Sequence, residues 1–526
     1  MSSVIGIDLG TTNSCVAALE HGQPVVIPNT GGYKTTPSYF AVTEAGKRLV
    51  GHLAKRQAIT NAANTVYASK RLIGSSFNSP EVEHARSLVP YEIVEGPNQD
   101  TRLKIADRVY TIPEVSGAVL REMKRVAEEY LGEPVRKAVI TVPAYFNDAQ
   151  RQTTRDAGRL AGLEVLRIIN EPTAAALAYG MGRHETERIA VYDLGGGTFD
   201  ISILQIGNGV LEVLATGGDT HLGGEDFDYR LVSYLMEMFE QQEGMSLSED
   251  RMALQRLKDA AEKAKCDLSQ LDQAEVNLPF IAADQDGQAR HLTATLQRSQ
   301  LEDQARELIE KTGEICRRVL DDARLRPDDI DQVLLVGGQS RMPMVQAFVE
   351  DLFGRAPHKG VNPDEVVAIG AALQAAMLMN DQAGPLLVDV TPLSLGIETQ
   401  GGHFARLIER NTKVPVSRNE IFTTTRDNQD VVKIRVLQGE SDASGDNNLL
   451  GEFSLTGIPA APKGEPEIEV TFDIDANGIV SVSAKDLATN LEQSVQVDPR
   501  GTLSREELKQ LVDEYAQNEG AVALKD

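Results

Sequence analysis

The sequence predicts an α/β domain of two similar lobes, followed by an antiparallel β-sandwich and a short C-terminal helix. A glycine-rich loop between two apolar strands occurs twice, and strands alternate with helices through most of the chain. After Gln382 the helical spacing gives way to strand alternation. A length of 526 residues is enough for about three domains.

The second glycine-rich loop lies within residues 191–201, which read Val-Tyr-Asp-Leu-Gly-Gly-Gly-Thr-Phe-Asp-Ile. Three residues without Cβ let the backbone approach a ligand closely, and N–H groups of a turn can form an anion nest. Asp193 and Asp200 flank the turn, where carboxylates can hold a hydrated Mg²⁺, and Thr198 offers a hydroxyl to a terminal phosphate. Taken alone, this loop is also compatible with an ordinary hairpin.

The first loop removes that ambiguity. Residues 4–14 read Val-Ile-Gly-Ile-Asp-Leu-Gly-Thr-Thr-Asn-Ser, so the Asp-Leu-Gly sequence recurs, followed here by Thr11 and Thr12. A duplicated phosphate loop predicts two lobes that clamp one nucleotide, each contributing an aspartate and a threonine.

Composition excludes several classes of protein. A formal net charge of -26 provides no basic footprint for nucleic acid, so we reject a nucleic-acid role. The three cysteines, Cys15, Cys266 and Cys316, form no Cys-x-x-Cys pair, which argues against a disulfide framework or a zinc site and favours a reducing cytoplasm. No signal sequence precedes the first strand, and the longest near-apolar run, Val366–Met379, is too short to span a bilayer. We therefore expect no membrane association.

Local patterns predict the elements between the loops. We expect helices over Pro113–Leu131 and over Asp148–Leu163, the latter with an aspartate N-cap, and a strand over Val165–Ile169 that places Glu171 in a turn at its end. Lys70 lies between apolar residues and reads as a surface lysine unless the fold turns it toward the phosphates. The charged helix Leu254–Leu268 reads as a solvated face with i,i+4 ion pairs.

These segments together resemble the 70-kilodalton heat-shock chaperones, the heat shock protein 70 family, of the bacterial DnaK type. The resemblance runs from Val4 to about Asp498 and rests on residues 5–14, 170–173, 193–200, 217–228, 336–343, 362–372 and 389–399. It implies an actin-like ATPase domain over residues 1–382, a linker over 383–390, a peptide-binding β-sandwich over 391–502 and a helix over 503–526.

The resemblance also assigns the ATPase site. Lys70, Glu171, Thr198 and Asp200 correspond to the catalytic residues, and Asp8, Asp193 and Asp200 to the carboxylates around Mg²⁺ and its waters. The residues expected to contact ATP or ADP are Asp8, Gly10, Thr11, Thr12, Asn13, Asp193, Gly195, Gly196, Gly197, Thr198, Gly223, Gly224, Glu262, Lys265, Ser269, Gly338, Ser340, Arg341 and Asp364. For Glu262, Lys265 and Ser269, this assignment replaces the reading of their helix as a solvated face. Cys266 stands where some relatives carry an arginine that stacks on the base. The family also allows a K⁺ ion.

In the β domain, the resemblance implies a cleft for extended apolar peptides lined by Ile397, Gln400, Phe404, Phe422, Thr425, Val432, Ile434 and Val436. Gln400 and Thr425 replace the Met and Ala that arch over the peptide in many relatives. For coupling between the domains it implies Arg167, Asn170, Leu386, Leu387 and Asp389, where a J-domain cochaperone also binds. A nucleotide-exchange factor of GrpE type is the other expected partner.

The C-terminal helix begins with a capping box at Ser504–Glu507 and has Leu508, Leu511, Val512 and Tyr515 on one face, so we expect it to pack against the sandwich. Relatives continue into a long helical lid, and residues 517–526 could supply only a stub. We therefore expect most of the lid to be missing.

The predicted function is that of a cytoplasmic, ATP-dependent chaperone in which ATP binding and hydrolysis control the affinity for unfolded peptide. One alternative is a holdase or adaptor that binds nucleotide and hydrolyses it too slowly to cycle. A sugar kinase on the same fold is disfavoured, because the chain from Asp389 onward reads as a β domain.

Overall fold

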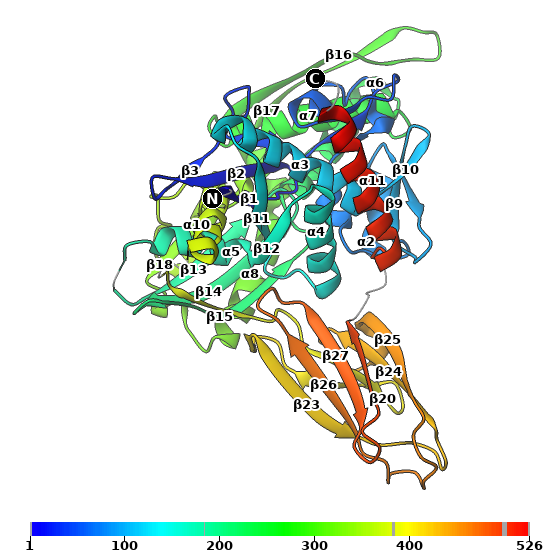
Figure 1. Cartoon of the computed structure of the whole chain (residues 1–526). Helices are drawn as coiled ribbons and strands as arrows, with labels where there is room; N and C mark the ends of the chain where they lie inside the picture. The colour runs from blue at the N-terminus through cyan, green and yellow to red at the C-terminus, as the bar shows by residue number, and fades with distance from the viewer. Residues whose placement is uncertain (1–2, 184, 381–383, 497–501, 524–526) are drawn as a thin grey trace.

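The computed structural model describes residues 3–183, 185–380, 384–496 and 502–523, which form a large α/β part and a smaller β-sandwich (Figure 1). The α/β part contains two six-stranded sheets, and the sandwich contains two four-stranded sheets. Among the described residues, no helix is both long and apolar enough to cross a membrane.

The first lobe is built on a sheet of strand order β12-β11-β1-β2-β3, with β4 paired to β2. Strand β1 pairs in parallel with β11 and antiparallel with β2, so the first loop lies at a hairpin beside a parallel strand. The elements of this lobe are β1 (Ser3–Asp8), β2 (Asn13–Glu20), β3 (Gln23–Val26), β4 (Thr35–Pro37), β5 (Phe40–Val42), β6 (Arg48–Val50), α1 (His52–Arg56), η1 (Ala62–Asn64), β7 (Thr65–Val66), η2 (Ser69–Leu72), α2 (Pro80–Leu88), β8 (Glu92–Glu95), β9 (Thr101–Ile105), β10 (Arg108–Thr111), α3 (Ile112–Leu131), β11 (Val135–Val142), α4 (Asp148–Leu160), β12 (Glu164–Asn170) and α5 (Glu171–Gly180).

The second lobe repeats this arrangement around the order β18-β13-β14-β15-β19-β22. Strand β13 pairs antiparallel with β14 and in parallel with β18, which matches the pairing of β1 with β2 and β11. The duplicated loop correctly predicts this repeat. Its elements are β13 (Glu187–Leu194), β14 (Phe199–Gly207), β15 (Val210–Asp219), α6 (Gly224–Glu243), α7 (Arg251–Leu268), β16 (Gln273–Ala283), β17 (Ala289–Gln297), α8 (Arg298–Asp322), η3 (Pro327–Asp329), β18 (Gln332–Val336), η4 (Gly338–Arg341), α9 (Pro343–Phe353) and α10 (Val366–Asn380).

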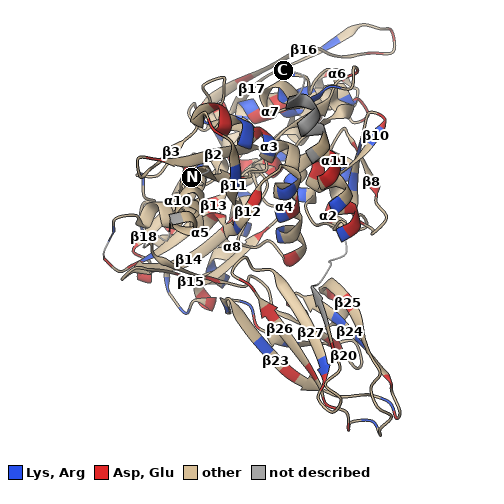
Figure 2. Cartoon of the chain, in the orientation of Figure 1, with Lys and Arg blue, Asp and Glu red and all other residues tan. Residues whose placement is uncertain are grey.

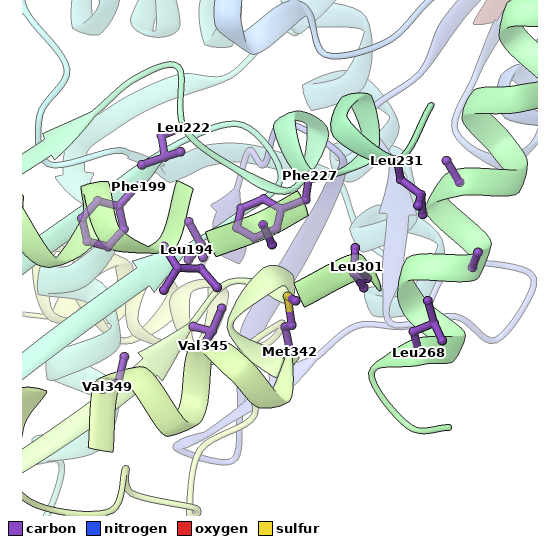
Figure 3. Close-up of a cluster of buried hydrophobic side chains, with 14 of the residues drawn as sticks. Leu194, Phe199, Leu222, Phe227, Leu231, Leu268, Leu301, Met342, Val345 and Val349 are labelled. Atoms are coloured by element: carbon purple, nitrogen blue, oxygen red, sulfur yellow. The ribbon is translucent and has the colours of Figure 1, made fainter. Parts of the chain in front are cut away.

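The core of the second lobe holds the central hairpin against α6. Leu194 and Phe199 lie at the two ends of the glycine loop, and they belong to one buried cluster with Leu222 and Phe227 (Figure 3). Both hairpin residues are fully buried. Because core side chains are close-packed, this contact fixes where the loop lies relative to the start of α6.

Two details of the α/β part differ from the sequence prediction. The N-cap of α4 is Asn147, whose side chain accepts from Gln150 N, and Asp148 is the first helical residue. The helix ends at Leu160, and the chain then turns at Gly162, where φ is +72°. Glu171 is the first residue of α5 and not part of a turn, because β12 leads directly into that helix.

The sandwich follows the alternation expected from the sequence. Its sheets have the orders β21-β20-β24-β25 and β23-β26-β27-β28. Ile434, Val436 and Phe472 are buried between them. The elements after α10 are β19 (Leu386–Val390), β20 (Leu395–Thr399), β21 (His403–Ile408), β22 (Lys413–Val414), β23 (Val416–Phe422), β24 (Val431–Gln438), η5 (Ser444–Asp446), β25 (Asn448–Thr456), β26 (Ile468–Ile474), β27 (Val480–Asp486), β28 (Glu492–Gln496) and α11 (Arg505–Ala523).

The position of α11 contradicts the prediction that it packs against the sandwich, because it lies on the first lobe (Figure 1). The Tyr515 hydroxyl donates to Glu114 Oε1 at 3.1 Å, and its ring centroid is 4.6 Å from the Arg121 guanidinium carbon. Arg102 forms an ion pair of 2.9 Å with Glu507. An acidic helix is thus attracted to arginines of the first lobe, a long-range match that helical periodicity cannot reveal.

Candidate nucleotide site

A cavity of about 310 Å³ lies between the two lobes. Most of the predicted nucleotide residues line it: Asp8, Gly10, Thr11, Thr12, Asn13, Lys70, Glu171, Asp193, Gly195, Gly196, Thr198, Gly224, Glu262, Lys265, Gly338, Arg341 and Asp364. The predicted residues outside the lining are Gly197, Asp200, Gly223, Ser269 and Ser340. Ser269 and Ser340 instead donate to the carbonyl oxygens of Lys265 and Gly337.

The two phosphate loops face each other across this cavity. A Cβ on Gly196 would lie 2.0 Å from Thr12 Oγ1, so a larger residue would separate the second loop from the first. The start of α6 pairs with the second loop, since Gly224 N donates to Gly195 O at 2.9 Å and Glu225 N to Gly196 O at 2.8 Å. Glycine is therefore needed here for close approach of three chain segments.

Lys70 and Glu171 meet in the buried part of the site. Lys70 Nζ lies 2.6 Å from Glu171 Oε1, and both side chains are almost fully buried. Lys70 comes from the short helix η2 and Glu171 from the first turn of α5. The fold therefore turns Lys70 inward, and the surface reading of this lysine is wrong.

Three buried aspartates lie beside this pair. Burial and the charge of Glu171 raise the pKa of Asp8 to about 7 and that of Asp200 to about 8, and they raise the pKa of Asp193 well above its usual value. Asp200 Oδ1 accepts from Tyr145 N at 2.9 Å, while its buried Oδ2 has no hydrogen-bond partner among the residues that the structure describes. So many neighbouring carboxylates favour a bound cation, and their oxygen chemistry fits Mg²⁺.

Direct ligation of the metal is not indicated. Within the described ranges, no three His, Cys, Asp or Glu side chains are arranged to hold a metal ion. Contact through the waters of a hydrated Mg²⁺, as predicted from the sequence, needs no such cluster and stays a prediction.

The side of the cavity assigned to adenosine is formed by α7 and the segment after β18. Lys265 Nζ forms an ion pair of 2.9 Å with Asp228, and Glu262 forms one of 3.0 Å with Lys55 of the first lobe. On the opposite wall, Arg341 Nη2 donates to Asn362 Oδ1 at 2.9 Å and pairs with Asp364. These ion pairs and hydrogen bonds fix the positions of the charged side chains on the two walls.

Sequence reasoning missed several residues of the lining, namely Cys15, Thr35, Asp228 and Gln339. Cys15 follows the first loop and faces the cavity from β2. The glycine-rich stretch containing Asp228 was recognised, but its pairing with Lys265 of another helix leaves no local signal. The three cysteines are free thiols.

The predicted peptide residues are spread over both sheets of the sandwich. Ile397 and Val436 are direct partners on neighbouring strands and lie in the core with Ile434. Phe404 is buried, Phe422 and Val432 are half-buried, and Gln400 and Thr425 are exposed. Thr425 N donates to Gln429 Oε1 at 3.1 Å, which orders its loop. The assignment of a cleft stays a prediction.

The linker residues lie in a groove between the domains. Leu386, Leu387 and Val388 pair in parallel with β15, so the linker adds a strand to the second lobe. Asp389 accepts from the Thr173 hydroxyl at 3.0 Å, and Arg167 Nη2 donates to Ala476 O of the sandwich at 3.4 Å.

Arg151 joins this groove to the first lobe. It donates to Asn170 Oδ1 at 2.7 Å and to Asn477 O at 3.4 Å. The predicted coupling residues Arg167 and Asn170 therefore lie beside the sandwich as well as beside the linker.

Asp148 makes this interdomain contact sensitive to pH. Its Oδ1 accepts from Val480 N of the sandwich at 2.8 Å, and burial raises its pKa to about 7. When the domains separate, water returns and the pKa falls to its usual value of about 3.9. Asp148 then binds its proton more tightly when the sandwich is docked on the α/β domain than when the two are apart. Docking is therefore favoured most below about pH 4 and weakens as pH rises toward 7.

We therefore expect the docked fraction to fall as pH rises from about 5 to 7 and to change little at higher pH, measured by energy transfer between dyes on the α/β domain and the sandwich. Asp148→Asn should remove most of this pH dependence, whereas Asp473→Asn, at an exposed position in β26, should keep it. An equal pH dependence in Asp148→Asn and the parent would contradict the assignment.

Figure 2 shows Lys and Arg interspersed with Asp and Glu along both domains. The fold and the site define a nucleotide-binding protein in which a two-lobed α/β domain is joined through a linker strand to a β-sandwich. The family model described as Hsp70 protein matches residues 4–523. The chain thus belongs to the Hsp70 family, whose members are ATP-dependent chaperones that bind ATP or ADP with magnesium and act on client polypeptides with cochaperones.

Proposed function

We propose that the protein is an ATP-hydrolysing chaperone of the bacterial DnaK type, in which the nucleotide state sets the affinity of the sandwich for extended apolar peptide. One observation carries this proposal, which is the linker strand β19 inserted beside β15. The sandwich then contacts Asp148 at the start of α4, and Tyr145, three residues earlier, donates its backbone N–H to Asp200. A change in the bound nucleotide near Asp200 would therefore occur close to the contact between α4 and the sandwich.

The site residues take the following roles in the proposal. Asp8, Asp193 and Asp200 would hold Mg²⁺ through its waters, and the ion supplies neutralisation of phosphate charge. Lys70 donates a hydrogen bond to the terminal phosphate, and the Glu171 carboxylate orients the attacking water by accepting a hydrogen bond from it. Thr198 contributes a hydroxyl donor to the same phosphate.

The proposed partners are unfolded or extended client segments, a J-domain cochaperone near Arg167 and Asn170, and an exchange factor of GrpE type, all in the bacterial cytoplasm. Steady-state ATPase assays with and without an apolar peptide and a J-domain protein test the proposal. We expect both additions to accelerate hydrolysis. Hydrolysis that neither addition accelerates would contradict coupling between the two domains.

Pro385 weakens the docking of the linker in this proposal. Leu386 N donates to Gly209 O at 2.8 Å, but the preceding proline has no N–H to extend the ladder. Pro385→Val supplies a residue of high strand propensity with a free N–H, which allows β19 to begin one residue earlier, and a gain of about 1 kcal/mol shifts the docking equilibrium about fivefold. We expect higher basal or J-stimulated ATPase, with Pro459→Val in an exposed loop as the control. An unchanged ATPase under both conditions would refute this role.

A further inference from the structure

We propose that Lys258 is a positioning residue that joins the segment carrying Lys70 to the phosphate loop of the second lobe, and that it slows the release of ADP. The inference rests on the proposed function and adds to it a residue outside the nucleotide cavity. Lys258 belongs to α7, within the charged helix that sequence reasoning read as a solvated face.

The Lys258 ammonium lies in a buried cage formed by both lobes. Its Nζ lies 3.4 Å from the centroid of the Tyr67 ring, which belongs to the first lobe, and 2.7 Å from Glu225 Oε2 of the second. Only 5% of Lys258 and 2% of Tyr67 is exposed. A cation over an aromatic face binds more strongly when both are shielded from water.

Lys258 and Glu225 are both charged in this cage. Burial lowers the pKa of Lys258, but Glu225, Tyr229 and Asp228 together outweigh this effect, and the net result is a raised pKa. Burial raises the pKa of Glu225, but Lys258, Arg71 and Lys265 together outweigh it, and the net result is a lowered pKa. The pair therefore stays ionised near neutral pH.

Each partner of Lys258 leads directly to the nucleotide site. Tyr67 directly follows β7, three positions before Lys70, and its carbonyl accepts from the Tyr91 hydroxyl at 2.7 Å. Glu225 lies in the first turn of α6, and its backbone N–H donates to Gly196 O of the phosphate loop at 2.8 Å. Lys258 thus links the segment that carries Lys70 to the second phosphate loop, although Lys258 itself does not line the cavity.

Neighbouring contacts reinforce this connection between the lobes. Arg71, one residue after Lys70, donates to Gly197 O at 3.1 Å and pairs with Asp226. These groups are also largely buried, in contrast to the Lys55–Glu262 pair, whose side chains are 35% and 25% exposed. If the lobes separate to release ADP, the Lys258 ammonium has to leave the Tyr67 ring of the first lobe while it stays paired with Glu225 of its own lobe, and this step is slow because the cation–π contact is shielded from water.

Dissociation of a fluorescent ADP analogue tests the role of Lys258. Removing the lysine alone would leave Glu225 buried and unpaired, so the decisive variant is the double replacement Lys258→Met with Glu225→Gln, which removes both charges at similar volume. We expect about tenfold faster release, since the shielded cation–π contact between the two lobes is lost. Lys258→Arg retains the charge and should release ADP close to the parent rate.

A second pair of variants distinguishes the effect of losing the aromatic contact from the effect of losing folding stability. Tyr67→Phe keeps the ring and should behave like the parent, whereas Tyr67→Leu should release ADP faster even at temperatures where circular dichroism shows both variants to be folded. Parent-like release from the double variant would overturn the proposal, as would equally fast release from Lys258→Arg. Failure of the proposed function would instead appear as an absence of ATP hydrolysis in the parent protein.

Discussion

Lys70→Ala should leave ATP binding largely intact and slow hydrolysis about 100-fold, the usual effect of removing one donor to developing charge. Binding is shared by the many residues that line the cavity, whereas Lys70 is the lysine whose ammonium lies 2.6 Å from Glu171. Because the expected loss is in the transition state, kcat should fall while the dissociation constant for ATP changes little.

Single-turnover hydrolysis of prebound ATP measures this effect, with the dissociation constant obtained separately. Lys104→Ala is the matched control, because Lys104 lies in the same lobe in an exposed ion pair with Glu92. Parent-rate hydrolysis by Lys70→Ala would show that the assigned catalytic pair is wrong.

Gly223→Ala should weaken nucleotide binding about 10- to 100-fold, because a Cβ there forces overpacking at the phosphate loop. The added Cβ would lie 2.6 Å from Gly197 N and 2.7 Å from Gly196 C, and these are backbone atoms that no side-chain rotation can move away. The start of α6 would then separate from the second loop and disturb its N–H groups.

Titration with a fluorescent ATP analogue measures this loss of affinity. Gly445→Ala is the control, since a Cβ at Gly445 would meet nothing within 4 Å. Unchanged affinity in Gly223→Ala would mean that the phosphates do not depend on the contact between α6 and the loop.

Local sequence patterns predicted the helices and strands better than they predicted which elements pack against one another. The hairpin around residues 194–199 and the sandwich strands follow from periodicity and glycine placement, which are local properties. The position of α11 depends on Arg102 and Arg121 of the first lobe, far away in the sequence. The capping box could therefore predict where the helix begins but not which surface it covers.

The same limit applies to the site. The duplicated loops predicted which segments line one side of the cavity, because their glycines and aspartates lie in adjacent positions of the sequence. On α7, periodicity could not distinguish solvated charges from the buried Lys258 and Lys265, since their partners Glu225 and Asp228 lie on α6. A buried ion pair between two helices can be recognised only once the packing is known.

Dissociation of a fluorescent apolar peptide, measured once with ADP and once with ATP bound, tests the control of peptide affinity by nucleotide most directly. The pairing of the linker with β15 and the contacts of the sandwich with α4 and Arg167 predict that release is faster with ATP than with ADP. Pro385→Val, which strengthens linker docking, should widen this difference. Equal release rates in the two nucleotide states would contradict the account, because the sandwich would then bind peptide independently of the ATPase domain.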